Sequence, residues 1–172
     1  MAVSNFKFIN LFNEINKTIN EFKKLIIIIF FSIIFLTGIL SVKDYGTINE
    51  EYNQRLNGFI TLNYLGEKFL PEITKKYKGD KEFSKFSDVP EHLRYYGGVV
   101  LHSPLAFLEV VLGINDKKNV FLFKHYVYFL IFFLSLISFF DITKNRFTNW
   151  KYGILSVLIL FLSPRIFANS FY

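Results

Sequence analysis

The 172-residue sequence contains no cysteine, and long stretches of it contain no charge. Without cysteine, neither a disulfide framework nor a thiolate metal site can form. Residues 25–42 hold no Asp, Glu, Lys or Arg in 18 consecutive positions. A soluble domain mixes charged and apolar residues along every element. The segregation of charge therefore predicts an integral membrane protein.

Positive charge is in excess, but its distribution argues against nucleic-acid binding. The chain has 20 Lys and Arg against 14 Asp and Glu. Between residues 43 and 118, however, eleven basic residues are matched by eleven acidic ones. The excess lies near the N-terminus and over 144–151. This is the positive-inside pattern of membrane proteins and not a basic groove, so we expect no nucleic-acid partner.

The N-terminal part predicts a surface helix followed by a membrane anchor. Residues 1–24 place apolar residues at helical spacing among lysines, which indicates an amphipathic helix on the cytoplasmic surface. Residues 25–42 are just long enough to cross about 30 Å of hydrocarbon. A signal peptide is the competing interpretation, but no A-x-A-like cleavage site follows. We therefore predict an uncleaved first span.

A long polar segment, 43–121, follows the first span. Residues 50–65 predict an amphipathic helix that ends near Gly66, and residues 71–91 predict a loop. Start and stop signals predict a second short helix over 104–112, which is too short to cross a bilayer. We expect both helices to lie at the membrane interface.

The C-terminal third predicts two further apolar segments. Residues 122–140 form the second span and residues 141–151 a short basic connection. Residues 152–172 form a third apolar run, interrupted at Ser163, Pro164 and Arg165. The chain stops after this run without a polar tail, so we expect a piece of a longer protein.

Charge then sets the topology. The short basic segments 1–24 and 141–151 should both face the cytoplasm, which places 43–121 outside. A fourth span through 97–114 is the alternative, but it would move 141–151 to the wrong side. The predicted fold is all-α: a multi-pass membrane protein with about three transmembrane helices and interfacial helices in a long first outer loop.

The first candidate site is the acidic pair Glu50 and Glu51, with Arg55 one turn later. Two carboxylates at the outer membrane surface can act as a general base or hold a divalent cation. The alternative is helix capping: Thr47 and Glu50 have capping-box spacing, and acids are favoured in a first helical turn. Both interpretations remain open from the sequence.

Basic residues on the same predicted side form the second candidate. Arg165 lies in the outer half of the third run, where a charge costs a few kcal/mol unless it is paired. A phosphate is the natural anionic partner of a guanidinium, and snorkelling to the interface is the alternative. Lys124 and His125 begin the second span and can contact lipid phosphate or serve as interfacial anchors. Together with the acids they predict an outer site for an anionic, lipid-linked substrate. His102 and Glu109 are weaker candidates.

These residues resemble the landmarks of a known family, the GT-C glycosyltransferases. The similarity is to the bacterial relatives of the dolichyl-phosphate-mannose–protein mannosyltransferases and to the lipid A aminoarabinose transferase. It covers roughly residues 25–172. In order along the chain, the similar segments are KDYGTINEE (43–51), RLNG (55–58), YYGG (95–98), KH (124–125), SPRIFA (163–168) and FY (171–172).

The resemblance implies an inverting transfer of a sugar from a polyprenyl-phosphate donor on the outer side of a bacterial inner (plasma) membrane. The family's catalytic Asp-Glu pair falls on Asn49 and Glu50, with Glu51 following. Because an amide cannot act as a carboxylate base, Glu50 or Glu51 must do so here. Arg165 would face the donor phosphate or the acidic site. A further acidic position of the family lies beyond Tyr172, so the isolated chain is expected to be inactive.

Two other functions remain open from the sequence. One is a small non-enzymatic membrane assembly or accessory protein. The other is a transporter fragment, in which interrupted spans surround a site at the midplane of the membrane. The sequence predicts no specific metal ligands, and a divalent cation is the one cofactor it leaves open.

Overall fold

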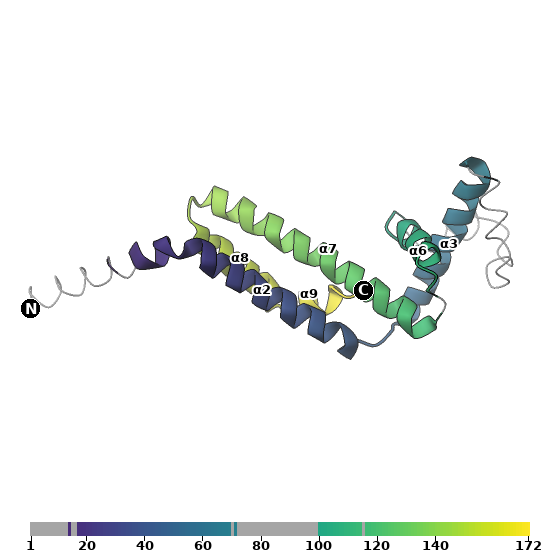
Figure 1. Cartoon of the computed structure of the whole chain (residues 1–172), viewed down its shortest axis with the longest axis horizontal. Helices are drawn as coiled ribbons and strands as arrows, with labels where there is room; N and C mark the ends of the chain where they lie inside the picture. The colour runs from purple at the N-terminus through teal and green to yellow at the C-terminus, as the bar shows by residue number, and fades with distance from the viewer. Residues whose placement is uncertain (1–13, 15–16, 70, 72–99, 115) are drawn as a thin grey trace, which may run out of the picture. The chain divides into compact units, whose positions relative to one another are not determined.

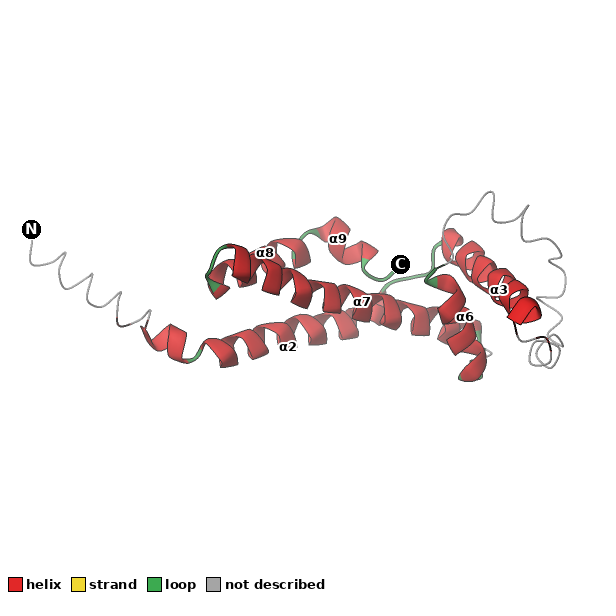
Figure 2. Cartoon of the chain, turned by 90° about the horizontal axis from the view of Figure 1, so that it is seen from above, coloured by secondary structure: helices red, strands yellow, loops and turns green. Residues whose placement is uncertain are grey.

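Helices make up most of the part of the chain that the structure describes. The computed structural model describes residues 14, 17–69, 71, 100–114 and 116–172, and no strand occurs among them (Figures 1 and 2). The elements are α2 (Lys23–Ser41), the 3₁₀ helix η1 (Val42–Asp44), α3 (Asn49–Phe69), α6 (His102–Val111), α7 (Lys117–Arg146), α8 (Trp150–Phe161) and α9 (Pro164–Asn169). The predicted all-α fold is confirmed for these residues.

The chain divides into two compact units. Unit 1 consists of residues 1–42 and 129–170, and unit 2 consists of residues 43–128 and 171–172. Helix α7 contributes its C-terminal part to unit 1 and its first part, up to residue 128, to unit 2.

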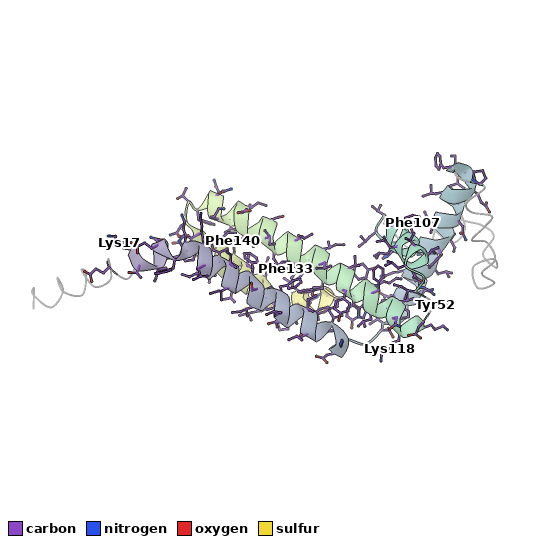
Figure 3. All side chains as sticks on the ribbon, viewed as in Figure 1. Lys17, Tyr52, Phe107, Lys118, Phe133 and Phe140 are labelled. Atoms are coloured by element: carbon purple, nitrogen blue, oxygen red, sulfur yellow. The ribbon has the colours of Figure 1, made fainter. Side chains whose placement is uncertain are left out.

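Unit 1 is held together by aromatic and aliphatic side chains between α2, α7 and α8. The ring of Phe31 meets two rings of α7, Phe133 and Phe140, edge to face, with centroids 6.0 and 5.6 Å apart. This is the geometry that aromatic pairs prefer. Both α7 residues are labelled in Figure 3. Val157 of α8 and Leu136 of α7 are buried in the same cluster.

Glycines bring the helices of unit 1 into close contact. A Cβ atom at Gly38 would lie 1.8 Å from the Cζ atom of Phe129, and one at Gly153 would lie 2.7 Å from the ring of Phe140. A side chain at either position would force the facing phenylalanine ring to shift. Small residues at helix contacts are typical of helices that pack within a bilayer.

Two segments are long and apolar enough to cross a membrane. They are Lys23–Asp44, which comprises α2 and η1, and the 30-residue helix α7. The outward face of α2 is strongly apolar: the side chains of Ile28, Ile33 and Leu40 are all more than half exposed. An exposed apolar surface of this kind is typical of helices that contact hydrocarbon or another apolar surface.

The third apolar run forms two helices and not one. Helix α8 has 12 residues, so it extends about 18 Å, whereas the hydrocarbon core is about 30 Å thick. The break follows from Pro164, which has no backbone N–H to continue α8 and instead occupies the first turn of α9. The expected single transmembrane helix over 152–172 is therefore not formed as one continuous helix.

In unit 2, α3 packs against α6. The helix predicted over 50–65 runs from Asn49 to Phe69 and passes Gly66 without ending, and the helix predicted over 104–112 is α6. The contact is close at Gly58, where a Cβ atom would lie 2.4 Å from the carbonyl oxygen of His102. Residues 72–91 of the predicted loop, and most of residues 1–16, lie outside the described residues.

Candidate functional site: a buried charged cluster in unit 2

A carboxylate and an imidazole meet in the interior of unit 2. Oε1 of Glu51 lies 3.0 Å from Nε2 of His125, and the two side chains are 1% and 2% exposed. Glu51 comes from the first turn of α3, and His125 comes from the first part of α7. Since a carboxylate only accepts, the His125 Nε2–H must donate this hydrogen bond.

The structure distinguishes the two carboxylates that the sequence could not separate. The side chain of Glu50 is exposed, whereas that of Glu51 is buried. Both lie in the first turn of α3, where the helix dipole favours negative charge. The backbone N–H of Glu51 donates to the carbonyl of Ile48 at 3.1 Å, which fixes the start of the helix. Because Glu50 and Glu51 occupy successive positions in the first turn of α3, their side chains point in different directions, and that of Glu51 points into the interior of unit 2.

Two charged atoms of the cluster have no hydrogen-bond partner among the described residues: Oε2 of Glu51 and Nζ of Lys124. Lys124 is 2% exposed, and its ammonium lies 5.9 Å from the centre of the Phe121 ring. Glu109, Arg55 and Glu51 are the charged groups that act on this ammonium. A buried charge is costly unless it is paired and hydrogen-bonded. These two atoms therefore stand out as places where a ligand could bind.

An ion pair links α3 to α6 beside this cluster. Nε of Arg55 donates to both carboxylate oxygens of Glu109 at 3.0 and 3.1 Å, and a terminal nitrogen of Arg55 also contacts Oε1. The guanidinium also lies 5.2 Å from the centre of the Phe59 ring. Arg55, a predicted substrate ligand, is thus held by Glu109. Sequence reasoning placed little weight on Glu109 because its partner lies 54 residues away.

Aromatic residues from both ends of unit 2 complete the surroundings of His125. The ring of Tyr172 meets the imidazole edge to face at 5.4 Å, and its hydroxyl donates to the carbonyl of Gly46 at 3.0 Å. The neighbouring Phe171 is fully buried and stacks on Tyr45 at 4.3 Å. Phe171 and Tyr172 were family landmarks in the sequence, but nothing in their spacing indicated this contact.

A second histidine lies in unit 2. Nδ1 of His102 lies 3.1 Å from the hydroxyl of Tyr128. Burial, and secondarily the positive charge of Lys124, lower the pKa of His102. His102 is therefore neutral near pH 7, and the tautomer of its ring sets which of the two groups donates the hydrogen bond.

Arg165, the remaining predicted ligand, belongs to unit 1. It is the second residue of α9, and its side chain is exposed. Its role as a phosphate ligand stays a prediction.

The cluster does not offer a ready set of metal ligands. Within the described residues, no group of three or more His, Asp or Glu side chains is arranged to hold a metal ion. One oxygen of Glu51 is already bonded to His125, and both oxygens of Glu109 accept from Arg55. Three of the four oxygens of these two carboxylates are therefore engaged with protein donors.

The arrangement can instead bind an anion and accept a proton. Lys124 supplies a desolvated positive charge for an anionic group. Oε2 of Glu51 can take a proton, since His125 occupies only the other oxygen of the carboxylate.

Comparison with protein-family models, with curated proteins and with solved structures gives no match to this chain.

Proposed function

We propose that this protein is a multi-pass membrane glycosyltransferase, of which these residues form the N-terminal part. It transfers a sugar from a polyprenyl-phosphate-linked donor to an acceptor on the outer side of a bacterial inner membrane. The observation that supports the proposal best is the joint burial of Lys124 and Glu51 in one cluster. Each has a charged atom without a hydrogen-bond partner among the described residues.

The chemistry of such a transfer uses both atoms. The acceptor hydroxyl attacks the anomeric carbon of the sugar, and the bond from that carbon to the phosphate oxygen breaks. The electron pair of this bond leaves with the phosphate, whose growing charge Lys124 stabilises. The proton of the hydroxyl passes to Oε2 of Glu51. One side chain thus serves the leaving group and the other serves the nucleophile.

The membrane part of the proposal rests on unit 1. Helices α2 and α7 provide two crossings, and α8 with α9 provides the third. A break such as the one at Pro164 is tolerated at membrane depth where protein or water satisfies the freed backbone groups. A donor anchored by a polyprenyl chain moves within the bilayer, so a membrane-embedded protein suits it.

Donor binding tests the anion site. The chain is placed in nanodiscs of neutral lipid and titrated with a radiolabelled polyprenyl-phosphate hexose. Lys124→Gln should weaken binding by at least about tenfold, because it removes a buried charge partner. Lys118→Gln is the matched control, since Lys118 is an exposed lysine on the same helix (Figure 3). Equal affinities for the wild type and both variants would refute the proposed site.

Sugar transfer tests the base. In membranes from cells that express the full-length protein, Glu51→Gln should reduce transfer by about 10²–10⁴-fold, the usual effect of losing a general base. Glu50→Gln is the matched control, because Glu50 neighbours Glu51 but is exposed. If the two variants lose activity equally, or neither does, Glu51 is not the base.

A further inference from the structure

The charged cluster of unit 2 contains more basic groups than acidic ones. Arg55 and Glu109 form an ion pair and cancel. Lys124 and Glu51 carry opposite charges and also cancel. His125 then decides the total: the cluster is neutral if the imidazole is neutral, and it carries one positive charge if the imidazole is protonated.

This difference matters because the cluster is shielded from water. The most exposed of its side chains, Arg55, is only 13% exposed, and the others are nearly fully buried. A net charge in such surroundings is unfavourable, because the protein interior solvates it poorly. A polyprenyl-phosphate sugar is a phosphodiester with one negative charge. If it bound beside Lys124 while His125 stayed neutral, the filled site would carry one uncompensated negative charge.

We infer that this site binds a phosphodiester anion together with one proton, and that His125 holds this proton. The imidazolium would remain bonded to Oε1 of Glu51, 3.0 Å from Nε2. The carboxylate would keep its negative charge, and Oε2 would remain able to act as a base. The inference takes its ligand class from the proposed function and adds the protonation state of the occupied site.

The same protonation state keeps the site neutral through the transfer step. Before transfer, the imidazolium and Lys124 offset Glu51 and the phosphodiester. During transfer, Glu51 gains the proton of the acceptor hydroxyl and loses its charge. The broken bond leaves its electron pair on the phosphate, which becomes a monoester with two negative charges. The sum remains zero, so no net charge is created in the buried site.

Other titratable groups face the Glu51–His125 pair, and a change in their protonation has to be distinguished from one at His125. Around the pair lie Lys124 and Tyr128 of α7, Arg55 of α3, Glu109 and His102 of α6, and the C-terminal Tyr172. Tyrosine and arginine side chains do not ordinarily titrate near pH 7. Lys124 is buried as well, so the nitrogen signal of His125, and not the proton count alone, assigns the proton. Among the described residues, His102 is the other histidine, and it is bonded to Tyr128. A variant at His102 therefore serves as the control.

Calorimetry measures the proton directly. The chain in nanodiscs of phosphatidylcholine is titrated with the farnesyl phosphodiester of mannose, in two buffers that differ in ionisation enthalpy. Binding should take up about one proton, and on the alkaline side the Kd should rise about tenfold per pH unit, as linkage of one proton requires. His125→Gln should abolish the uptake and weaken binding. His102→Gln should leave both unchanged.

A second measurement needs no variant. With ¹⁵N-labelled histidine, the imidazole nitrogens of the three histidines of the wild-type chain can be observed directly. Adding the phosphodiester should convert the His125 signal from neutral to imidazolium. If the signal stays neutral while the ligand is bound, the inference is wrong even if His125→Gln fails to fold.

The outcomes separate this inference from the proposed function. Binding that does not depend on Lys124 overturns the proposed function. Binding that depends on Lys124 but takes up no proton overturns the inference alone. Inorganic phosphate and phosphatidylglycerol are titrated in parallel. Equal proton-coupled binding of phosphatidylglycerol would support the site but assign it to ordinary phospholipid headgroups.

Discussion

Replacing Gly58 by alanine should force α3 and α6 apart. The added Cβ atom would lie 2.4 Å from the carbonyl oxygen of His102 and 2.8 Å from its carbonyl carbon. These are backbone atoms, which cannot rotate away as the end of a side chain can. Restoring an ordinary contact requires the two helices to separate by about 1 Å.

Two opposing terms set the size of the effect. Overpacking of this kind costs about 1–3 kcal/mol. Alanine also favours a helix over glycine by about 1 kcal/mol. Because the clash is with backbone atoms, we expect the overpacking cost to lie at the upper end of its range, which leaves a net loss of about 2 kcal/mol. For a chain of this length such a loss lowers the Tm by about 4–8 °C.

Thermal unfolding in detergent, followed by circular dichroism, measures the change. Gly46→Ala is the matched control, because no other atom lies within 4 Å of the Cβ position at Gly46. The control should unfold close to the wild-type temperature. If Gly58→Ala unfolds there too, the close approach of α3 to α6 is not what holds unit 2 together.

Three further predictions concern single interactions. Glu109→Gln leaves the guanidinium of Arg55 without its charge partner and should lower the free energy of unfolding by about 3 kcal/mol in chemical denaturation. A near wild-type midpoint would show that solvent replaces the carboxylate. Thr148 has a φ of 53°, which suits glycine far better than a β-branched residue, so Thr148→Gly should gain about 1 kcal/mol, seen as a raised Tm. An unchanged or lower Tm would count against this strain. Because folding lowers the pKa of His102 below its ordinary 6.5, the unfolded chain binds a proton first as the pH falls. The free energy of unfolding should therefore decrease below about pH 6.5, and His102→Gln should decrease less. Parallel pH profiles of the wild type and His102→Gln would contradict the assignment.

Composition and periodicity were sufficient to predict α2, α3, α6 and α7, but not the division of the third apolar run into α8 and α9. The charge-free run at 25–42 lies within the span formed by α2 and η1, and the run at 122–140 lies within α7. Their ends were less accurate, since α7 extends to Arg146 and α3 continues past Gly66. Helix ends depend on local capping and packing, which hydrophobic periodicity does not report.

The site depended on contacts that a linear sequence hides. Glu51 and His125 are 74 residues apart, and only folding shows that they share a hydrogen bond. The sequence did identify both as candidates, through their position at predicted span ends and through a family resemblance. Glu109 was undervalued because the cost of a charge was judged without its partner, Arg55. A charge that is paired with a residue on another helix is much less costly to bury than an unpaired charge.

The energetics of the cluster favour a functional role over a structural one. The Arg55–Glu109 pair satisfies its hydrogen bonds and can be explained by packing alone. Lys124 and Glu51 cannot be explained by packing alone, because each has a buried charged atom without a partner in the part of the chain that the structure describes. A methionine in place of Lys124 would fill similar space at lower cost. A lysine buried at this position costs stability, which is the pattern expected of a side chain that binds a ligand.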